Sequence, residues 1–360
     1  MEHSRCRSRR GTLFQSNHMN KSPHKRLDIR SVASLQPTLF SLDVDGNLQI
    51  ENTPPTEVGD SPARVVWSYD KKTRKEQAAA LRAMRLIYTP TILATGSVPG
   101  KTLFDNVAPH RVNPELGESR IFYLTDIVDA YGSVQQDVME QKVERILGSR
   151  YANGRNLRGA RNVVASYIEE GAFLPGVPGL PQGNATSPDL YNWYMAHADN
   201  VLAFKIWAER NLHPRVATRY LDDLTISSTD EDGVGRSFRR SVRTIYGHFA
   251  PGMEFSHPKS RILHLNADNP ITITGLSIYA DGRITPSPEL LTAANAVFGE
   301  MARKLAEYEE ITDHDLALVA GYNGVLSMPG EARHSASELV RTMGAYAHLL
   351  IEQMKPRIQR

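Results

Sequence analysis

The sequence predicts an α+β fold in which strands meet around an acidic turn and helices precede and follow them. Apolar and β-branched residues flank two adjacent acids in residues 216–227, a pattern typical of strand, tight turn and strand. Residues 75–90 have the composition of a helix that should end near Pro90. Helical runs separated by breaks fill residues 286–360. Together these features favour an antiparallel sheet combined with helices.

The composition is that of an ordinary globular protein. The 360 residues are 41% hydrophobic and 23% charged, with a formal net charge of +2. No apolar run approaches the roughly 18 residues that a membrane helix needs, and none resembles the core of a secretory signal. The single cysteine, Cys6, excludes an intrachain disulfide. We therefore expect a cytoplasmic protein with no membrane partner.

Two of the predicted strands present acids. Residues 120–125 form a short apolar run that predicts a buried strand with Asp126 at its end. Asp222 and Asp223 occupy the turn of the predicted hairpin. Carboxylate oxygens suit Mg²⁺, and two such ions can clamp the attacking and leaving oxygens of a phosphoryl transfer. An Asp-Asp pair alone is more often a solvated turn, so a metal site here depends on the motifs around it.

Between these acids, residues 179–188 form a loop punctuated by glycine and proline. Ser187 is predicted to cap the helix that follows, with Pro188 at its first position and Asp189 near its positive end. The loop should therefore be anchored. Further along, residues 234–250 predict a basic helix. Residues 271–278, turning at 281–282, predict a β-hairpin.

Three motifs in this order resemble the successive palm motifs of reverse transcriptases: Thr125–Tyr131, Leu180–Gly183 followed by Ser187 and Pro188, and Tyr220–Asp223. The resemblance covers about residues 60–330 and is strongest over 120–227. It implies a right-hand polymerase with fingers, a palm of antiparallel sheet plus helices, and a helical thumb. The implied division is a basic N-terminal tail at 1–30, fingers and connecting region at 31–119, palm at 120–285 and thumb at 286–360.

The resemblance implies that Asp126, Asp222 and Asp223 are the catalytic residues and hold two Mg²⁺ ions. It also gives Tyr131 a role as the bulky side chain under the sugar, where it would exclude a 2′-hydroxyl and favour deoxynucleotides. An ordinary core aromatic is the alternative for Tyr131.

Four further positions are implied to contact substrate. Gln182 and Gly183 would line the incoming nucleotide and the template base, with the glycine permitting close approach. Asp129 matches a position near the triphosphate, and a plain surface acid is its alternative. Lys259 lies in residues 257–262, which resemble the lysine-bearing motif of the family. An ammonium there would stabilise or protonate departing pyrophosphate.

Two shorter motifs resemble elements of retron reverse transcriptases. Residues 106–110 resemble their Asn-Ala-x-x-His element, and residues 273–275 resemble their Val-Thr-Gly element. Val107, Leu221 and Ile273 depart from the usual residues, so another bacterial defence-associated reverse transcriptase stays an alternative. The residues implied to contact RNA are Asn106, His110, Thr274 and Gly275.

The fingers also depart from the family, because no lysine closely precedes Arg64–Val66. Lys71, Lys72 or Arg74 would have to replace it. The tail is rich in arginine and lysine, and two interpretations of it stay open: contact with RNA phosphates, or a terminus with no specific role. Residues 96–102 are one residue short of a phosphate-binding P-loop and predict an ordinary loop.

We therefore expect an RNA-directed DNA polymerase. Its partners would be a structured non-coding RNA that supplies template and primer, deoxynucleoside triphosphates and the DNA product. In the retron case the RNA also supplies a priming 2′-hydroxyl, and an effector protein would join it in antiphage defence. Two rivals stay open: an RNA-binding scaffold that has lost catalysis, and an RNA-dependent RNA polymerase, which the bulky Tyr131 opposes.

Overall fold

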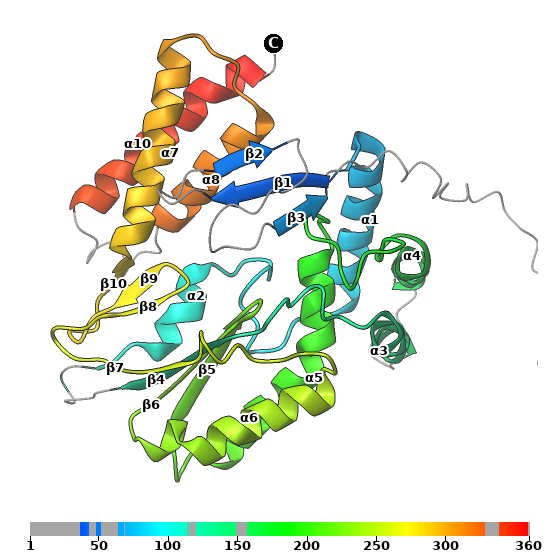
Figure 1. Ribbon diagram of the computed structural model, residues 1–360, viewed down its shortest axis with the longest axis vertical. Coiled ribbons are helices and arrows are strands. Elements are labelled where there is room, and N and C mark those ends of the chain that lie inside the picture. The colour runs from blue at the N-terminus through cyan, green and yellow to red at the C-terminus, as the bar shows by residue number, and fades with distance from the viewer. Residues whose placement is uncertain are drawn as a thin grey trace, which may run out of the picture. The chain divides into compact units, whose positions relative to one another are not determined.

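The fold combines helices with three small sheets whose strand pairings are all antiparallel, which confirms the predicted α+β class (Figure 1). The computed structural model describes residues 37–42, 48–51, 64–67, 69–113, 115, 120–148, 157–327 and 338–358. The predicted tail at 1–30 lies outside these residues. The described residues belong to one compact unit that spans residues 35–360.

A four-stranded sheet in the order β5-β6-β4-β7 lies at the centre of this unit. Its strands are β4 (Ile121–Asp126), β5 (Arg215–Tyr220), β6 (Asp223–Ser228) and β7 (Arg261–His264). All six residues of β4 are buried because both faces of the sheet are covered. Tyr123 belongs to the larger core and Phe122, one residue away, to a second core, as the alternation along a strand requires.

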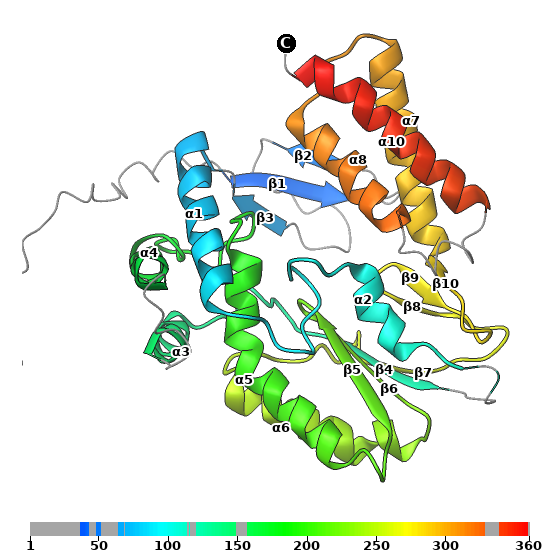
Figure 2. The ribbon, with the colours of Figure 1, turned by 180° about the vertical axis from the view of Figure 1, so that it is seen from behind.

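Helices α5 (Ser187–Ala208) and α6 (Arg236–Phe249) pack on the face of the sheet that carries Tyr123 (Figures 1 and 2). The same core includes residues of α1 (Lys71–Ile87), α3 (Gln136–Gly148) and α4 (Leu157–Glu170). The predictions of helices near 75–90 and 234–250 are therefore confirmed. Helix α1 begins after Asp70, whose carboxylate accepts a hydrogen bond from the Thr73 amide, and ends before Pro90.

The opposite face of the sheet packs against α2 (Leu103–Val107), η2 (Ala108–His110) and a three-stranded sheet in the order β10-β9-β8. The hairpin predicted to turn at 281–282 is present, because residues 276–278 pair antiparallel with residues 284–286. The sequence did not predict the further turn that lies within 271–278. Thr274 and Gly275 have φ angles of 45° and 87° and join β8 (Ile271–Ile273) to β9 (Leu276–Ile278). Such a two-residue turn with positive φ at both positions suits a tight hairpin. Residues 281–282 lie in the turn that joins β9 to β10 (Ile284–Pro286), as predicted.

The remaining elements lie at the two ends of the described chain. Strands β1 (Pro37–Leu42), β2 (Leu48–Glu51) and β3 (Arg64–Trp67) form a sheet in the order β2-β1-β3. Helices α7 (Pro288–Ala306), α8 (Asp313–Leu326) and α10 (Glu338–Ile358) share a core of their own. Hydroxyls of Ser287 and Thr312 cap α7 and α8. These helices agree with the helical character predicted for 286–360.

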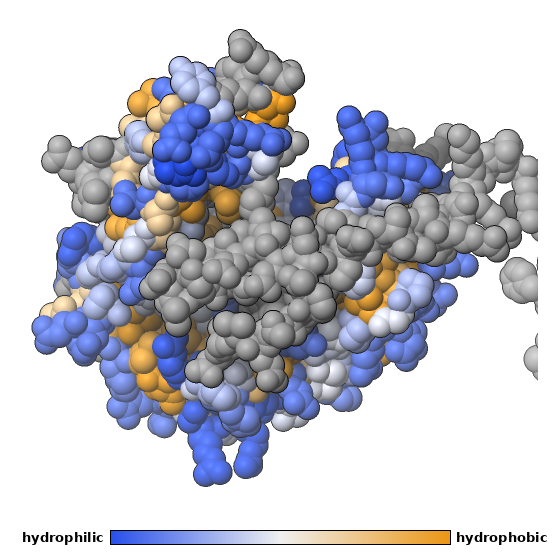
Figure 3. Space-filling view, turned by 45° about the horizontal axis from the view of Figure 1, so that its top comes forward, coloured by the Kyte–Doolittle hydropathy of each residue, from blue (hydrophilic) through white to orange (hydrophobic). Residues whose placement is uncertain are grey.

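Most of the described surface in Figure 3 is hydrophilic, with smaller apolar areas between the polar ones. Among the described residues, no helix is long and apolar enough to span a bilayer. The loop predicted at 96–102 is a loop. The predicted helix cap is displaced by one residue, because Thr186 is the N-cap and Ser187 is the first residue of α5.

Candidate active site

The three predicted acids gather at one end of the four-stranded sheet. Asp126, the last residue of β4, is the register partner of Asp223, the first residue of β6. Asp222 lies in the turn between β5 and β6, and its carbonyl accepts a hydrogen bond from the Ile127 amide at 3.2 Å. Leu221, also in the turn, has a φ of 55°. The local pattern of apolar strands and an acidic turn therefore brings together acids that are about a hundred residues apart in sequence.

The two carboxylate oxygens of Asp126 differ in their contacts. Its Oδ2 forms an ion pair with the Lys259 ammonium, which reaches it from the loop before β7. This contact is the main cause of a raised pKa for Lys259. Its Oδ1 is buried and has no hydrogen-bond partner. A buried carboxylate oxygen without a donor is a position that suits a cation.

The electrostatics of Asp223 also favour a cation. Desolvation is the largest cause that raises its pKa to about 6, followed by the carboxylates of Asp222 and Asp126. The side chain still reaches solvent on one side. Negative charge is therefore costly at this end of the sheet until positive charge arrives.

The donor set fits a divalent ion of the Mg²⁺ type, because its three side chains are carboxylates from adjoining positions. In the described part of the chain, however, no three acidic, histidine or cysteine side chains converge as a ready-made metal cluster. Lys259 holds Asp126 in this arrangement. Asp126, Asp222 and Asp223 are the residues that would hold the ions.

A cavity of about 880 Å³ opens beside Asp126 and Asp222. Tyr131, Asp129 and Gln182 line it, as the sequence predicted for groups around a nucleotide. Gly183, with a φ of 90°, is exposed next to Gln182 but is not among the residues that line the cavity. The other lining residues are Trp67, Ile127, Val128, Ala130, Gly132, Gly176, Val177, Pro178, Leu180, Pro181, Tyr191, Leu221, Ser256 and Lys259.

Two contacts hold Tyr131: one to its ring and one to its backbone carbonyl. Its ring packs edge-on against Tyr191, with the ring centres 5.5 Å apart. Burial is the main cause that raises the pKa of its phenol, so it stays neutral. The Leu180 amide donates to the Tyr131 carbonyl at 2.8 Å, and a Cβ on Gly179 would lie 2.0 Å from that same oxygen. The glycine of the loop is therefore needed for its close approach to Tyr131.

A second cavity, of about 460 Å³, lies on the other side of the acids. Asp126 and Lys259 line both cavities, whereas Asp222 lines the first and Asp223 the second. Arg261, Thr272 and Thr274 add polar groups to the second cavity. The acids therefore stand between two spaces, each large enough for part of a substrate.

No family model matches this chain, and no curated protein does. Similar solved structures include apo telomerase from Candida tropicalis, with a TM-score of 0.48 and 14% identity over 79% of this chain and 54% of that chain. Telomerase from Candida tropicalis with a TWJ fragment of telomeric RNA has a TM-score of 0.47 and 12% identity over 79% of this chain and 46% of that chain. This chain spans about half the length of those chains.

Asn106 and His110, predicted to contact RNA, are fully buried. His110 bonds to the hydroxyls of Ser227 and Thr218 at 2.8 Å each. Asn106 accepts a hydrogen bond from Thr95 and donates one to Thr274 at 3.2 Å. Neither side chain reaches the surface, so direct contact of either with RNA, as predicted, does not fit this structure. Their partners show that they fasten α2 and η2 to the sheet and to the β8–β9 turn.

Thr274 and Gly275 form that turn, and both are partly exposed. Thr274 lines the second cavity. A Cβ on Gly275 would lie 2.8 Å from the Leu290 side chain. The two short motifs at 106–110 and 273–275 are thus joined through Asn106 and Thr274.

The sequence analysis missed the support behind the acidic turn. Arg219 and Asp199 form an ion pair with both side chains 0% exposed. The available signals were a charged residue inside the apolar strand before Tyr220 and an acid inside an apolar stretch of α5.

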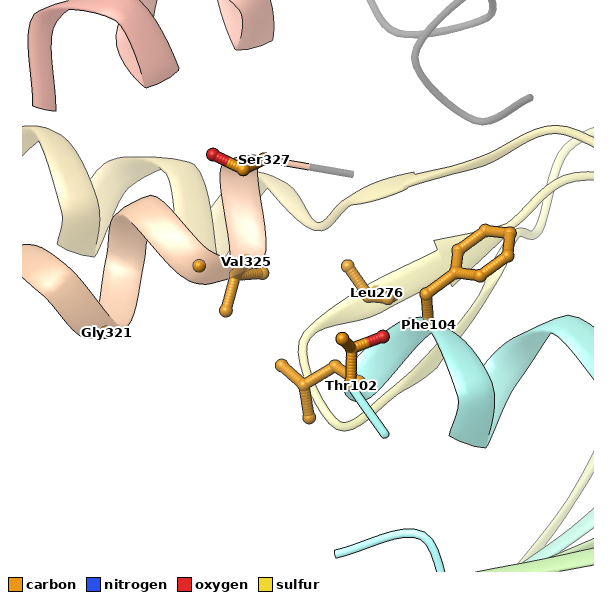
Figure 4. A pocket seen from close by; sticks show the side chains of 8 residues that line it. Thr102, Phe104, Leu276, Gly321, Val325 and Ser327 are labelled. Carbon is orange, nitrogen blue, oxygen red and sulfur yellow. The ribbon is translucent and has the colours of Figure 1, made fainter. Parts of the chain in front are cut away.

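A third cavity, of about 220 Å³, lies away from the acids between α2, β9 and α8. Figure 4 shows Thr102, Phe104 and Leu276 on one side of it and Val325 on the other. Its lining is mostly apolar, and it contains none of the predicted site residues.

Proposed function

We propose that this chain is an RNA-directed DNA polymerase that joins deoxynucleotides by nucleotidyl transfer. The observation that carries the proposal is the register pairing of Asp126 with Asp223 beside Asp222, between two cavities. The three sequence motifs that resemble reverse transcriptases supply the first cavity with Tyr131 and Gln182. A solvated turn that merely carries acids would not be expected to lie between two cavities lined by these motif residues.

In the proposed mechanism, Asp126, Asp222 and Asp223 would hold two Mg²⁺ ions. When bound, such ions activate the primer hydroxyl and neutralise charge on the triphosphate. The first cavity would take the incoming nucleotide, with the Tyr131 ring against its sugar. The second cavity would take the primer end, next to Asp223 and Thr274.

Lys259 has the position for an acid or a charge-neutralising group. Its ammonium contacts Asp126 and lines both cavities, and most of its side chain is exposed. The raised pKa keeps it protonated at neutral pH. We propose that it stabilises or protonates the pyrophosphate as it leaves.

The proposed template is a structured non-coding RNA copied into short DNA, in the manner of a retron and in antiphage defence. The support for this finer proposal is the resemblance of residues 106–110 and 273–275 to retron elements. Another defence-associated reverse transcriptase with different priming is the alternative.

A second candidate function is an RNA-binding scaffold without catalysis. It is favoured by the lack of a ready-made metal cluster in the described residues and by the Lys259 contact to Asp126. The retention of all three acids at one end of the sheet favours catalysis instead.

The experiment that separates these functions is expression of the protein with its native flanking DNA, followed by treatment of the copurified nucleic acid with DNase, RNase and a debranching enzyme. RNA-linked short DNA that disappears in Asp222→Asn supports the retron mechanism. DNA without a 2′–5′ branch favours another priming mode. RNA alone, in wild type and variant alike, favours the scaffold.

A further inference from the structure

A buried ion pair lies directly behind the acidic turn. Arg219 of β5 and Asp199 of α5 are both 0% exposed, and Nη2 of Arg219 lies 2.7 Å from Oδ2 of Asp199. A second contact joins Nε to Oδ1 at 2.9 Å. Apolar residues of similar volume stabilise a core as well as a buried ion pair does. Stability alone is therefore a weak reason for this pair.

The guanidinium has a further contact that explains its position. Nη1 of Arg219 donates to the carbonyl of Leu221 at 2.7 Å. Leu221 has a φ of 55°, a conformation that is costly for a residue other than glycine. This residue immediately precedes Asp222. The Arg219 side chain therefore holds the strained residue that lies next to Asp222.

The ion pair is itself fixed by neighbouring groups. Asp199 accepts hydrogen bonds from Thr91 and Tyr246, each at 2.8 Å. Nη2 of Arg219 also donates to Asn192 at 3.1 Å. Both carboxylate oxygens and all three guanidinium nitrogens thus have partners, so neither side chain has room to adopt another geometry.

Backbone hydrogen bonds also join Arg219 to the segment from Leu93 to Gly96. The Arg219 amide donates to Leu93, and its carbonyl accepts from Thr95 at 2.8 Å. Asn192 donates to the Gly96 carbonyl at 2.9 Å. A Cβ on Gly96 would lie only 2.8 Å from the Leu221 nitrogen. The segment from Leu93 to Gly96 therefore packs directly against the turn.

We propose that Arg219, held by Asp199, is a positioning residue that sets the turn conformation in which Asp222 binds divalent metal. The inference rests on the proposed function in that it takes Asp126, Asp222 and Asp223 as the metal-binding acids. Arg219 touches no substrate and acts through the Leu221 carbonyl. Its guanidinium also lies 5.6 Å from the ring centre of Tyr191, which lines the first cavity and packs on Tyr131.

The test compares Arg219→Lys with Arg215→Lys in the full-length protein. A lysine keeps the charge beside Asp199 but lacks the planar fork that reaches Leu221 and Asn192 together. Arg215 is a matched control on the same strand: it is 9% exposed, pairs with Glu209 at 2.6 Å and does not contact the turn. Both substitutions replace a buried, ion-paired arginine side chain of β5, so a general disturbance of the strand predicts weaker metal binding in both variants.

The readouts are Mn²⁺ affinity, measured by electron paramagnetic resonance without nucleotide, and the Mg²⁺ concentration that gives half-maximal nucleotide incorporation. We expect Arg219→Lys to weaken Mn²⁺ binding and raise that Mg²⁺ concentration by about tenfold or more. Arg215→Lys should change either by less than about twofold. Equal effects of the two substitutions, after correction for the folded fraction, overturn the inference.

A second pair of variants guards against loss of folding in Arg219→Lys. Gly96→Ala pushes on the turn and leaves the ion pair intact, whereas Gly159→Ala adds a methyl group where no atom lies within 4 Å. Weaker Mn²⁺ binding in Gly96→Ala alone supports the inference, and unchanged binding in both contradicts it.

Wild-type protein that binds Mn²⁺ through Asp222 without making DNA would refute the proposed function and leave this inference standing. Wild-type protein whose Mn²⁺ binding does not depend on Asp222 would overturn the inference.

Discussion

Asp126 and Asp223 lie directly opposite each other across β4 and β6. Side chains of register partners point to the same face of a sheet, so the two carboxylates approach each other at its end. Asp222 adds a third acid from the turn. Desolvation raises the pKa of Asp223, and the charges of Asp222 and Asp126 raise it further. Negative charge is therefore concentrated at this strand end, where a divalent cation would offset it.

The first prediction concerns Asp126, whose Oδ1 has no partner. Asp126→Asn should lower DNA synthesis by roughly 100-fold or more, because an amide is a poor ligand for a hard cation. Primer extension on an RNA template measures the effect. Asp137→Asn removes an exposed acid from the first turn of α3 and should leave the rate unchanged. Similar rates for Asp126→Asn and wild type would refute the role of Asp126.

The second prediction concerns the choice of sugar. Tyr131 lines the first cavity, which is the proposed nucleotide site, and its ring packs against Tyr191. Tyr131→Ala should raise incorporation of ribonucleotides relative to deoxynucleotides by about 10- to 100-fold, because the ring proposed to exclude the 2′-hydroxyl is removed. Tyr131→Phe keeps the ring and should keep the selectivity. Competition between the two nucleotide types gives the ratio, and an unchanged ratio in Tyr131→Ala would show that this side chain does not select the sugar.

The third prediction concerns the loop that meets Tyr131. Gly179 has a φ of 66°, and a methyl group there would collide with the Tyr131 carbonyl. Gly100 has a φ of 79° but faces open space. Gly100→Ala should therefore cost only the backbone strain, about 1 kcal/mol, whereas Gly179→Ala should cost about 2–4 kcal/mol. Urea unfolding of both variants measures the free energies, and equal losses would show that the loop does not pack closely on Tyr131.

The fourth prediction concerns pH and stability. Desolvation, with a smaller contribution from the Arg120 charge, lowers the pKa of His110 to about 3. In the unfolded chain its pKa is about 6.5, so the unfolded state binds the proton first as the pH falls. This difference at His110 should therefore lower the free energy of unfolding by about 2 kcal/mol between pH 6.5 and pH 5.

Substitution of His110 tests that dependence. His110→Gln should have a lower free energy of unfolding at pH 7 but a shallower loss between pH 6.5 and pH 5. Substitution of the exposed His264 by glutamine should leave the slope of the wild type unchanged. A slope for His110→Gln equal to that of the wild type would mean that His110 is not the group that titrates.

Local patterns were sufficient to predict the elements that present the acids. The alternation and β-branching of 216–227 predicted β5 and β6, and an apolar run predicted β4. Both patterns are properties of neighbouring residues, which is why a single sequence reveals them. The turn at 274–275 was not predicted. Two short strands joined by a two-residue turn resemble one continuous apolar run.

Contacts between distant residues were not predictable in this way. Lys259 reaches Asp126 across 133 positions, and Asn106 reaches Thr274 across 168. Burial of Asn106 and His110 depends on how α2 and η2 settle on the sheet, which no local period encodes. The same holds for Arg219 and Asp199, whose pairing depends on the packing of α5 against β5.

The most direct test of the central account is incorporation of a single deoxynucleotide by the purified full-length protein on an RNA template with an annealed primer. We expect extension of the primer that requires Mg²⁺ and is lost in Asp222→Asn, with the folded structure and RNA binding of that variant unchanged. Extension by Asp222→Asn at the wild-type rate, or no extension by folded wild-type protein that binds the template, would contradict the assignment of this acidic turn as a polymerase active site.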